Sequence, residues 1–225
     1  MMGSDLKVVK GMSFRTGQLT EWVKWKRLGS GGFRDVYLAT LTKPYLRSVA
    51  VKFCESPSPS LQKEYRVLRH FLHSPNIVQC YGESITVEDG VTNHNLLLEY
   101  AADGNLLKFD QDVRWENSRI WCEIADFGLA KQPGEREEYA IVSPYLQGTL
   151  MYMSPETFYE GKIGAAMDIW SLGCTIVEMK TGKPPSMETM EITDIIPQRM
   201  SKSGKDFLTR CFAMDPNQQR TAKSL

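Results

Sequence analysis

The first hundred residues of the chain carry hydrophobic patterns that are typical of β-strands. Apolar and polar side chains alternate in WVKWKRL (22–28). Three further runs are short and rich in apolar or β-branched residues: 35–40, 48–54 and 95–100. A helical pattern interrupts them at residues 60–73, where Ser60 is the expected N-cap. Its apolar face consists of Leu61, Tyr65, Leu68 and Leu72. These patterns predict a strand-rich first part with one amphipathic helix.

From about residue 155 onward the pattern becomes helical. Residues 166–182 (AMDIWSLGCTIVEMKTG) are apolar nearly all round, which predicts a helix at the centre of its unit. Residues 203–216 indicate an amphipathic helix that Pro216 stops. The turn signal AADG (101–104) lies between the two halves. The whole pattern predicts an α+β fold with a hinge near residues 99–104.

Composition narrows the partners and the compartment. Among the 225 residues, 27 Lys and Arg balance 27 Asp and Glu, so no net field favours nucleic acid or an anionic membrane. The five cysteines are an odd number without a C-x-x-C pair, which indicates reduced thiols. Charges interrupt the start of the chain where a signal peptide needs an apolar core, and no apolar run reaches 18 residues. We expect a soluble protein of the cytoplasm or the nucleus.

The glycine-rich stretch LGSGGFRDV (28–36) lies between two predicted strands. Such a stretch is most often an ordinary hairpin turn. A Rossmann or P-loop site needs a helix directly after the glycines, and here a strand pattern follows, so both are excluded. What remains is a β-hairpin whose backbone can lie over phosphates, with Val36 placed to cover a flat ring.

Lys52 ends the strand run VAVK (49–52), and Glu64 lies in the helix that follows. A single lysine at a strand end is normally a solvated charge. Glu64, however, lies beside the apolar stripe of its helix, where an unpaired carboxylate would be costly. We therefore predict an ion pair between Lys52 and Glu64 that fixes the ammonium to hold phosphate oxygens.

The stretch from Glu123 to Glu156 contains two further groups with chemical potential. Asp126 follows the apolar pair Ile124-Ala125, which indicates a metal-binding carboxylate at a strand end. Ser154-Pro155-Glu156 closes a loop that would receive a substrate.

Taken in order, these motifs resemble the signature set of eukaryotic protein kinases over essentially the whole chain. The matching residues are Gly29-x-Gly31, Val36, Val49-Ala50-Val51-Lys52, Glu64, Leu98-Glu99-Tyr100, Asp126-Phe127-Gly128, Ser154-Pro155-Glu156, Asp168-x-Trp170-Ser171-x-Gly173 and Arg220. GTLMYMSPE, with Thr149, resembles the Ser/Thr class. This stretch, with HSPNIVQCYG and DIWSLGCTIVEMKTGKPP, is similar to the MAP kinase kinase kinases, particularly those of plants.

The resemblance implies a bilobal kinase-like fold with a β-rich N-lobe and a helical, truncated C-lobe. We expect an N-terminal extension at 1–20, the N-lobe with its hinge at 21–103 and an incomplete C-lobe at 104–225. The implied reaction is transfer of the γ-phosphoryl group of ATP to a protein Ser or Thr in a MAP kinase cascade. The substrate would be a MAP kinase kinase, with no nucleic-acid or membrane partner.

The resemblance also assigns site residues. Lys52, Glu64 and Asp126 would be catalytic, and Asp126 would coordinate Mg²⁺. The residues that would hold ATP are Leu28, Gly29, Ser30, Gly31, Gly32, Val36, Ala50, Lys52, Leu98, Glu99 and Ala101. Glu156 would pair with Arg220. Regulation could phosphorylate the hydroxyls of Tyr139, Ser143 and Tyr145, although each is more simply an ordinary loop residue.

The pattern breaks between Glu99 and Asp126, which only 26 residues separate. The family places two helices, the catalytic loop and a hairpin there, which takes roughly twice that length, since αE alone needs ~20 residues. No His-Arg-Asp is present. We therefore expect the αD–αE–catalytic-loop segment to be missing. Two smaller departures accompany it: Arg34 replaces the third glycine, and residues 186–200 are too short for the usual helix.

One alternative keeps a catalytic loop in this short stretch. Asp112 and Asn117 have its D-x-x-x-x-N spacing, with Arg114 where the family has Lys. Only seven residues separate Gly104 from Asp112, however, so the helix that should present the loop does not fit. Residues 115–118 suit the variable loop before Asp126 equally well. We expect a kinase by family that is catalytically impaired; the alternative is a non-catalytic nucleotide-binding pseudokinase or scaffold.

Overall fold

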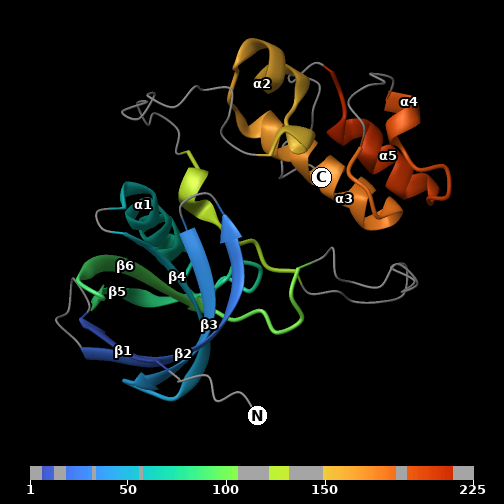
Figure 1. Cartoon of the computed structure of the whole chain (residues 1–225). Helices are drawn as coiled ribbons and strands as arrows, with labels where there is room; N and C mark the ends of the chain where they lie inside the picture. The colour runs from blue at the N-terminus through green and yellow to red at the C-terminus, as the bar shows by residue number, and fades with distance from the viewer. Residues whose placement is uncertain are drawn as a thin grey trace. The chain divides into compact units, whose positions relative to one another are not determined.

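The computed structural model describes residues 7–12, 19–31, 34–55, 58–105, 122–131, 149–185 and 192–214. The chain divides into two compact units, one made of residues 1–104 and 120–132, the other of 105–119 and 133–225. As Figure 1 shows, strands dominate the first unit and helices the second. This division confirms the predicted α+β class, with strands first and helices after.

The first unit is a closed antiparallel barrel. Its strands are β1 (Lys7–Met12), β2 (Leu19–Gly31), β3 (Arg34–Lys43), β4 (Arg47–Glu55), β5 (Cys80–Glu88) and β6 (Val91–Glu99). Their order around the barrel is β1-β2-β3-β4-β6-β5 (Figure 1). The runs predicted at 22–28, 35–40, 48–54 and 95–100 fall in β2, β3, β4 and β6, while β1 and β5 were not predicted.

Alternation along the strands separates two hydrophobic clusters, because successive side chains point to opposite faces. One cluster lines the barrel: Val9, Trp22, Ala39, Leu41, Val49, Val51 and Leu97. The other lies between the sheet and α1 (Pro59–Leu68): Leu61, Leu68, Val78, Cys80, Leu96 and Leu98. The second cluster is important for function, because its face of the sheet also carries Lys52.

Residues 7–12, within the expected N-terminal extension 1–20, form a strand of the barrel. β1 pairs with both β2 and β5, so it closes the sheet. The closure requires a glycine at position 11, since a Cβ there would lie 2.2 Å from Ser84 Oγ and 2.7 Å from the Ile85 carbonyl oxygen. The Thr20 hydroxyl donates to the Gly11 carbonyl (3.2 Å) and lies 2.7 Å from Ser84 Oγ.

Helix α1 is shorter than the predicted 60–73 and starts differently. Its N-cap is Ser58, not Ser60; the Ser58 hydroxyl accepts from the Leu61 amide at 3.4 Å, and Pro59 occupies the first turn. The α-helix ends at Leu68, and a 3₁₀ turn (Arg69–Phe71) follows. Leu72 therefore leaves the predicted apolar face and is 44% exposed.

The described part of the second unit contains a 3₁₀ turn, η6 (Leu150–Tyr152), and four α-helices. These are α2 (Pro155–Glu160), α3 (Ala165–Thr181), α4 (Ile192–Ile195) and α5 (Lys202–Cys211). Helix α3 matches the prediction to within one residue at each end, and Gly182, whose φ is 74°, caps it in a left-handed conformation. Helix α5 begins after the Ser201 cap and ends before the predicted boundary; Pro216 lies outside the described residues. Helices α2 and α4 were not predicted.

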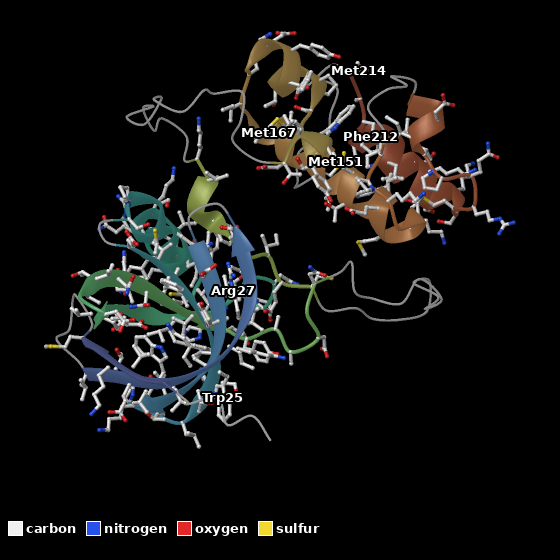
Figure 2. All side chains as sticks on the ribbon, in the orientation of Figure 1. Trp25, Arg27, Met151, Met167, Phe212 and Met214 are labelled. Atoms are coloured by element: carbon white, nitrogen blue, oxygen red, sulfur yellow. The ribbon has the colours of Figure 1, made fainter. Side chains whose placement is uncertain are left out.

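The core of the second unit forms where α3 meets α5. Its buried residues are Trp170, Cys174, Val177, Ile195, Leu208 and Phe212. The Phe212 ring, labelled in Figure 2, packs edge-on against Trp170 with centroids 5.0 Å apart. The sequence predicts that α3 is buried on every side. Leu172, however, is 41% exposed, so the described residues leave part of α3 uncovered.

All five cysteines are free thiols, as expected: Cys54, Cys80, Cys122, Cys174 and Cys211. Among the described residues no helix is long and apolar enough to cross a membrane.

Candidate functional site

Lys52 lies at the centre of the candidate site in the first unit. β4 presents it toward α1, and its Nζ lies 2.7 Å from Glu64 Oε2 and 3.0 Å from Oε1. The Glu64 side chain is fully buried. The predicted ion pair is therefore present, and it satisfies two charges that would otherwise be costly to bury.

The same ammonium reaches the carboxylate of Asp126. Lys52 Nζ lies 2.6 Å from Asp126 Oδ1, although α1, β5 and β6 come between them in the sequence. The Asp126 side chain is 73% exposed, whereas Glu64 is closed off from solvent. One carboxylate thus holds the lysine from within, while the other is open to a ligand.

Asp126 has a left-handed backbone, with φ 65° and ψ 67°. For a residue other than glycine this conformation costs about 1–3 kcal/mol, so the neighbouring residues must hold it. On one side, Ile124 forms a parallel bridge with Ile77. On the other, the Phe127 ring stacks on Phe71 with centroids 6.1 Å apart.

The glycine-rich hairpin predicted from the sequence joins β2 and β3. Gly29 pairs with Val36 and Gly31 with Arg34, so the hairpin is paired close to its turn. The space around Gly29 is open, since a Cβ there would meet nothing within 4 Å. Gly32 lies outside the described residues.

A row of apolar residues crosses the strands next to this hairpin. Leu38 pairs with Ala50, and Ala50 pairs with Leu98, so these residues form a row across β3, β4 and β6. Val36 is the partner of Lys52 in the same ladder. Val36, Ala50 and Leu98 thus lie on the same face of the sheet as Lys52. Leu28, on β2, is partly exposed.

The expected hinge follows β6. The Glu99 amide donates to the Gln79 carbonyl oxygen at 2.8 Å, and Glu99 Oε2 accepts from the Gln79 amide at 3.1 Å. The Ala101 carbonyl accepts from the Gly104 amide at 3.2 Å. Burial, together with the charge of Glu99, raises the pKa of Glu123.

The second unit contains a hydrogen bond that sequence reasoning did not find. The Tyr152 hydroxyl donates to the buried Glu178 carboxylate, and this bond, with burial, raises the pKa of Tyr152 to about 12. The Ser171 hydroxyl donates to the Tyr152 carbonyl oxygen at 2.7 Å. A possible signal was Glu178 itself, a carboxylate on the otherwise apolar helix α3.

Several expected residues do not come together in the described part of the chain. Glu156 lies in the first turn of α2, but its expected partner Arg220 is outside the described residues. The same holds for Asp112, Arg114, Asn117, Tyr139, Ser143 and Tyr145. The arrangement of a catalytic loop and the regulatory hydroxyls therefore stay predictions.

The described residues suit the binding of a nucleoside triphosphate together with a divalent cation. Lys52 offers a fixed positive charge, Asp126 an exposed carboxylate, and the Gly29 hairpin open backbone beside an apolar row. No group of three or more His, Cys, Asp or Glu among the described residues is arranged to hold a metal. Mg²⁺ would therefore rest on Asp126 and on phosphate oxygens, which is a usual arrangement for this ion.

Comparison with known proteins gives two family matches. The protein kinase domain matches residues 114–225, and the protein tyrosine and serine/threonine kinase family matches residues 23–118. The two matches meet at residues 114–118, inside the stretch where the kinase pattern breaks.

Curated relatives match nearly the whole chain. Mitogen-activated protein kinase kinase kinase 20 of Arabidopsis thaliana is 31% identical over 261 residues, covering 91% of this chain and 76% of that protein. Mitogen-activated protein kinase kinase kinase 17 of the same plant is 30% identical over 263 residues, covering 91% of this chain and 68% of that protein. Mitogen-activated protein kinase kinase kinase 5, also from this plant, is 30% identical, and the chain spans only 36% of the length of that protein.

The aligned regions are longer than the chain itself. With the first two relatives they extend over 261 and 263 residues, more than the 225 residues of the whole chain, of which they include 91%. These relatives therefore carry residues that have no counterpart here.

Proposed function

The chain belongs to the protein kinase family, and from this premise we propose that its first unit binds ATP with Mg²⁺. The observation that carries the proposal is the position of Lys52, whose ammonium contacts both the buried Glu64 and the exposed Asp126. We further propose that the chain derives from a protein serine/threonine kinase that acts on a MAP kinase kinase. The names of the plant relatives support this place in a MAP kinase cascade.

Lys52 would bind the phosphates as a point charge. Because Glu64 is fully buried and fixed on α1, the ammonium is held in one place before a ligand arrives. Such preorganisation lowers the entropy cost of binding. The remaining groups would bind the nucleotide from two sides: the Gly29 hairpin at the phosphates, and the row of Ala50 and Leu98 at the base.

Asp126 would hold the metal. The chemistry that Mg²⁺ supplies in phosphoryl transfer is neutralisation of phosphate charge, and Asp126 is the residue that would hold the ion here. The exposed Asp126 carboxylate suits this position because it already lies beside Lys52 and is open to solvent. Lys52 would then contribute charge to the phosphates beside the metal.

We propose that phosphotransfer by this chain is at or near background. The family positions the substrate hydroxyl with an Asp of its catalytic loop, and the short stretch between Glu99 and Asp126 lacks the His-Arg-Asp motif. Loss of a positioned base typically costs ~10²–10⁴-fold in rate. The meeting of the two family matches at 114–118 supports the same conclusion.

The second candidate function is a nucleotide-binding pseudokinase or scaffold that acts by engaging a partner protein. The observation that favours it is the contrast between the complete Lys52–Glu64–Asp126 group and the interrupted family match. We place this function in the cytoplasm and also in the nucleus, where the five free cysteines would stay reduced.

A labelling experiment separates the two functions. The full chain is incubated with Mg²⁺, γ-labelled ATP and a generic protein substrate, and nucleotide binding is measured on the same sample. Binding with background transfer supports the impaired kinase or pseudokinase. Strong transfer that disappears in Asp112→Ala would show that Asp112 and Asn117 supply a working catalytic loop. Absence of nucleotide binding would contradict the site itself.

A further inference from the structure

The side chain of Gln79 closes the loop between α1 and β5. Its Nε2 donates to the carbonyl oxygens of Ser74 (2.9 Å) and Ile77 (2.8 Å). Its Oε1 accepts from the His73 amide at 2.7 Å. One amide group thus supplies two donors and one acceptor to three backbone partners, a set that an apolar or purely accepting side chain of this length cannot provide.

The backbone of the loop needs this support. His73 has a φ of 66°, which is uncommon for a residue other than glycine. Its amide is the one that Gln79 Oε1 accepts. The Gln79 side chain therefore holds a turn that the local sequence alone does not favour.

The same loop holds the backbone on both sides of Asp126. The Ile124 amide donates to the Asn76 carbonyl oxygen at 2.8 Å, and the Val78 amide donates to the Ile124 carbonyl oxygen at 3.1 Å. After Asp126, the Phe127 ring stacks on Phe71 at the start of the loop. A shift of residues 73–78 would therefore shift the carboxylate that lies 2.6 Å from Lys52 Nζ.

Gln79 is also bonded to Glu99 at the expected hinge, but through its backbone alone. Glu99 N donates to Gln79 O, and Gln79 N donates to Glu99 Oε2. A change of the Gln79 side chain leaves these two bonds available. The side chain and the backbone of this residue therefore serve two different parts of the site.

We propose that Gln79 is a positioning residue for the metal-bearing carboxylate. Its amide fixes residues 73–78, the backbone of these residues holds Ile124, and Ile124 leads into Asp126 beside Lys52. The stack of Phe127 on Phe71 holds the other side of Asp126. Gln79 therefore controls the Mg²⁺-dependent part of ATP affinity, while the part that depends on the base and the hinge is left unchanged. This inference rests on the proposed ATP site.

The test compares Gln79→Met with Gln79→Glu in the full chain. Methionine keeps the length of the side chain and removes all three hydrogen bonds. Glutamate keeps the acceptor for the His73 amide and removes both donors. Gln62→Met is the matched control, because Gln62 is exposed on α1. ATP affinity is measured with Mg²⁺ and with EDTA, and amide hydrogen exchange is measured without ligand.

The ratio of ATP affinity with Mg²⁺ to that in EDTA should be about tenfold smaller in Gln79→Met than in the wild type. This is the factor that one to two net hydrogen bonds represent. Affinity in EDTA should change less than about twofold, since the hinge bonds remain. Exchange at the Ile124 and Val78 amides should accelerate, while the Glu99 amide and the β4 amides stay protected. Gln79→Glu should behave similarly, and Gln62→Met like the wild type.

Three outcomes would overturn the inference. The first is an unchanged Mg²⁺ gain in Gln79→Met while Lys52→Met still weakens ATP binding. The second is unchanged exchange at Ile124 and Val78. The third is equal loss of protection throughout β4, which would mean that Gln79 only stabilises the unit in general. If the wild type binds no ATP, the proposed function fails, and the exchange data still decide whether Gln79 holds the Asp126 segment.

Discussion

Lys52 and Asp126 are 74 positions apart in the chain, and their charged atoms lie 2.6 Å apart. Lys52 lies within strand β4, whereas Asp126 follows a short apolar run far along the chain. The barrel, α1 and the loop before β5 bring them together. A carboxylate in a strained backbone and open to solvent is thereby held beside a buried, fixed ammonium.

Removing Glu64 should destabilise the first unit more than removing both members of its ion pair. Glu64→Leu leaves the Lys52 ammonium in a largely buried place beside the exposed Asp126 carboxylate, and breaking a buried pair this way typically costs ~3–5 kcal/mol. In Lys52→Met/Glu64→Leu no buried charge remains, so much of the loss should be recovered. Thermal unfolding of the three proteins measures this. A double variant no more stable than Glu64→Leu would contradict the account of the pair.

Adding one methyl group at position 11 should destabilise the closed barrel. Gly11→Ala places a Cβ against Ser84 Oγ and the Ile85 carbonyl, so β1 must move, at a cost of about 1–3 kcal/mol. Gly29→Ala is the matched control, since its Cβ meets nothing within 4 Å. The comparison uses the melting temperature and amide exchange at Val9. Equal effects of the two changes would show that β1 does not close the barrel.

The Tyr152–Glu178 bond should make the second unit sensitive to alkaline pH. The hydrogen bond and burial raise the pKa of Tyr152 from 10.0 to about 12, so the folded state keeps the proton after the unfolded state has lost it. The stabilisation is complete below pH 10 and is lost as the pH rises from about 10 through 12. Unfolding of the wild type and of Tyr152→Phe, followed across this range, should show the smaller pH dependence in the variant. Parallel pH profiles would exclude this role.

Limited proteolysis should cut the second unit first. Leu172 on α3 and Met214 after α5 are exposed, so the described part of this unit buries its apolar side chains incompletely. Early cuts are expected after residue 104. The sequence alone predicts a surviving fragment near 20–100, but β1 is part of the barrel, so the resistant fragment should begin before Lys7. Mass spectrometry of the fragments tests both ends, and resistance of the whole chain would contradict the expectation.

The Lys52–Glu64 pair could be predicted because both signals are local. The strand pattern at 48–54 contains Lys52, and a helical period placed Glu64 beside an apolar stripe. Because burying either charge alone would be costly, an ion pair between the two residues was the favoured arrangement. The family motifs added Asp126, and the structure brings all three side chains together.

Features that depend on partners elsewhere in the chain were missed. β1 has a weak pattern, and it becomes a strand because Gly11 lets it approach β5. Ser58 rather than Ser60 caps α1 because Pro59 can start a helix, a choice that the apolar period does not reveal. Gln79 gave no signal, because its side-chain partners are backbone atoms of a loop that exists only after folding. The Tyr152–Glu178 bond joins two elements that sequence spacing does not relate.

The central claim is that Lys52 is the phosphate-binding group of an ATP site, and calorimetric titration tests it most directly. ATP with Mg²⁺ is titrated into the wild type, Lys52→Met and Lys43→Met. Lys43 is the matched control, because it lies on the same unit and is exposed, with a surface ion pair to Glu21 that contributes little. The account predicts measurable binding to the wild type and to Lys43→Met, and binding weakened about tenfold or more in Lys52→Met, as expected for loss of a charged hydrogen bond. Equal affinity of the wild type and Lys52→Met would contradict it.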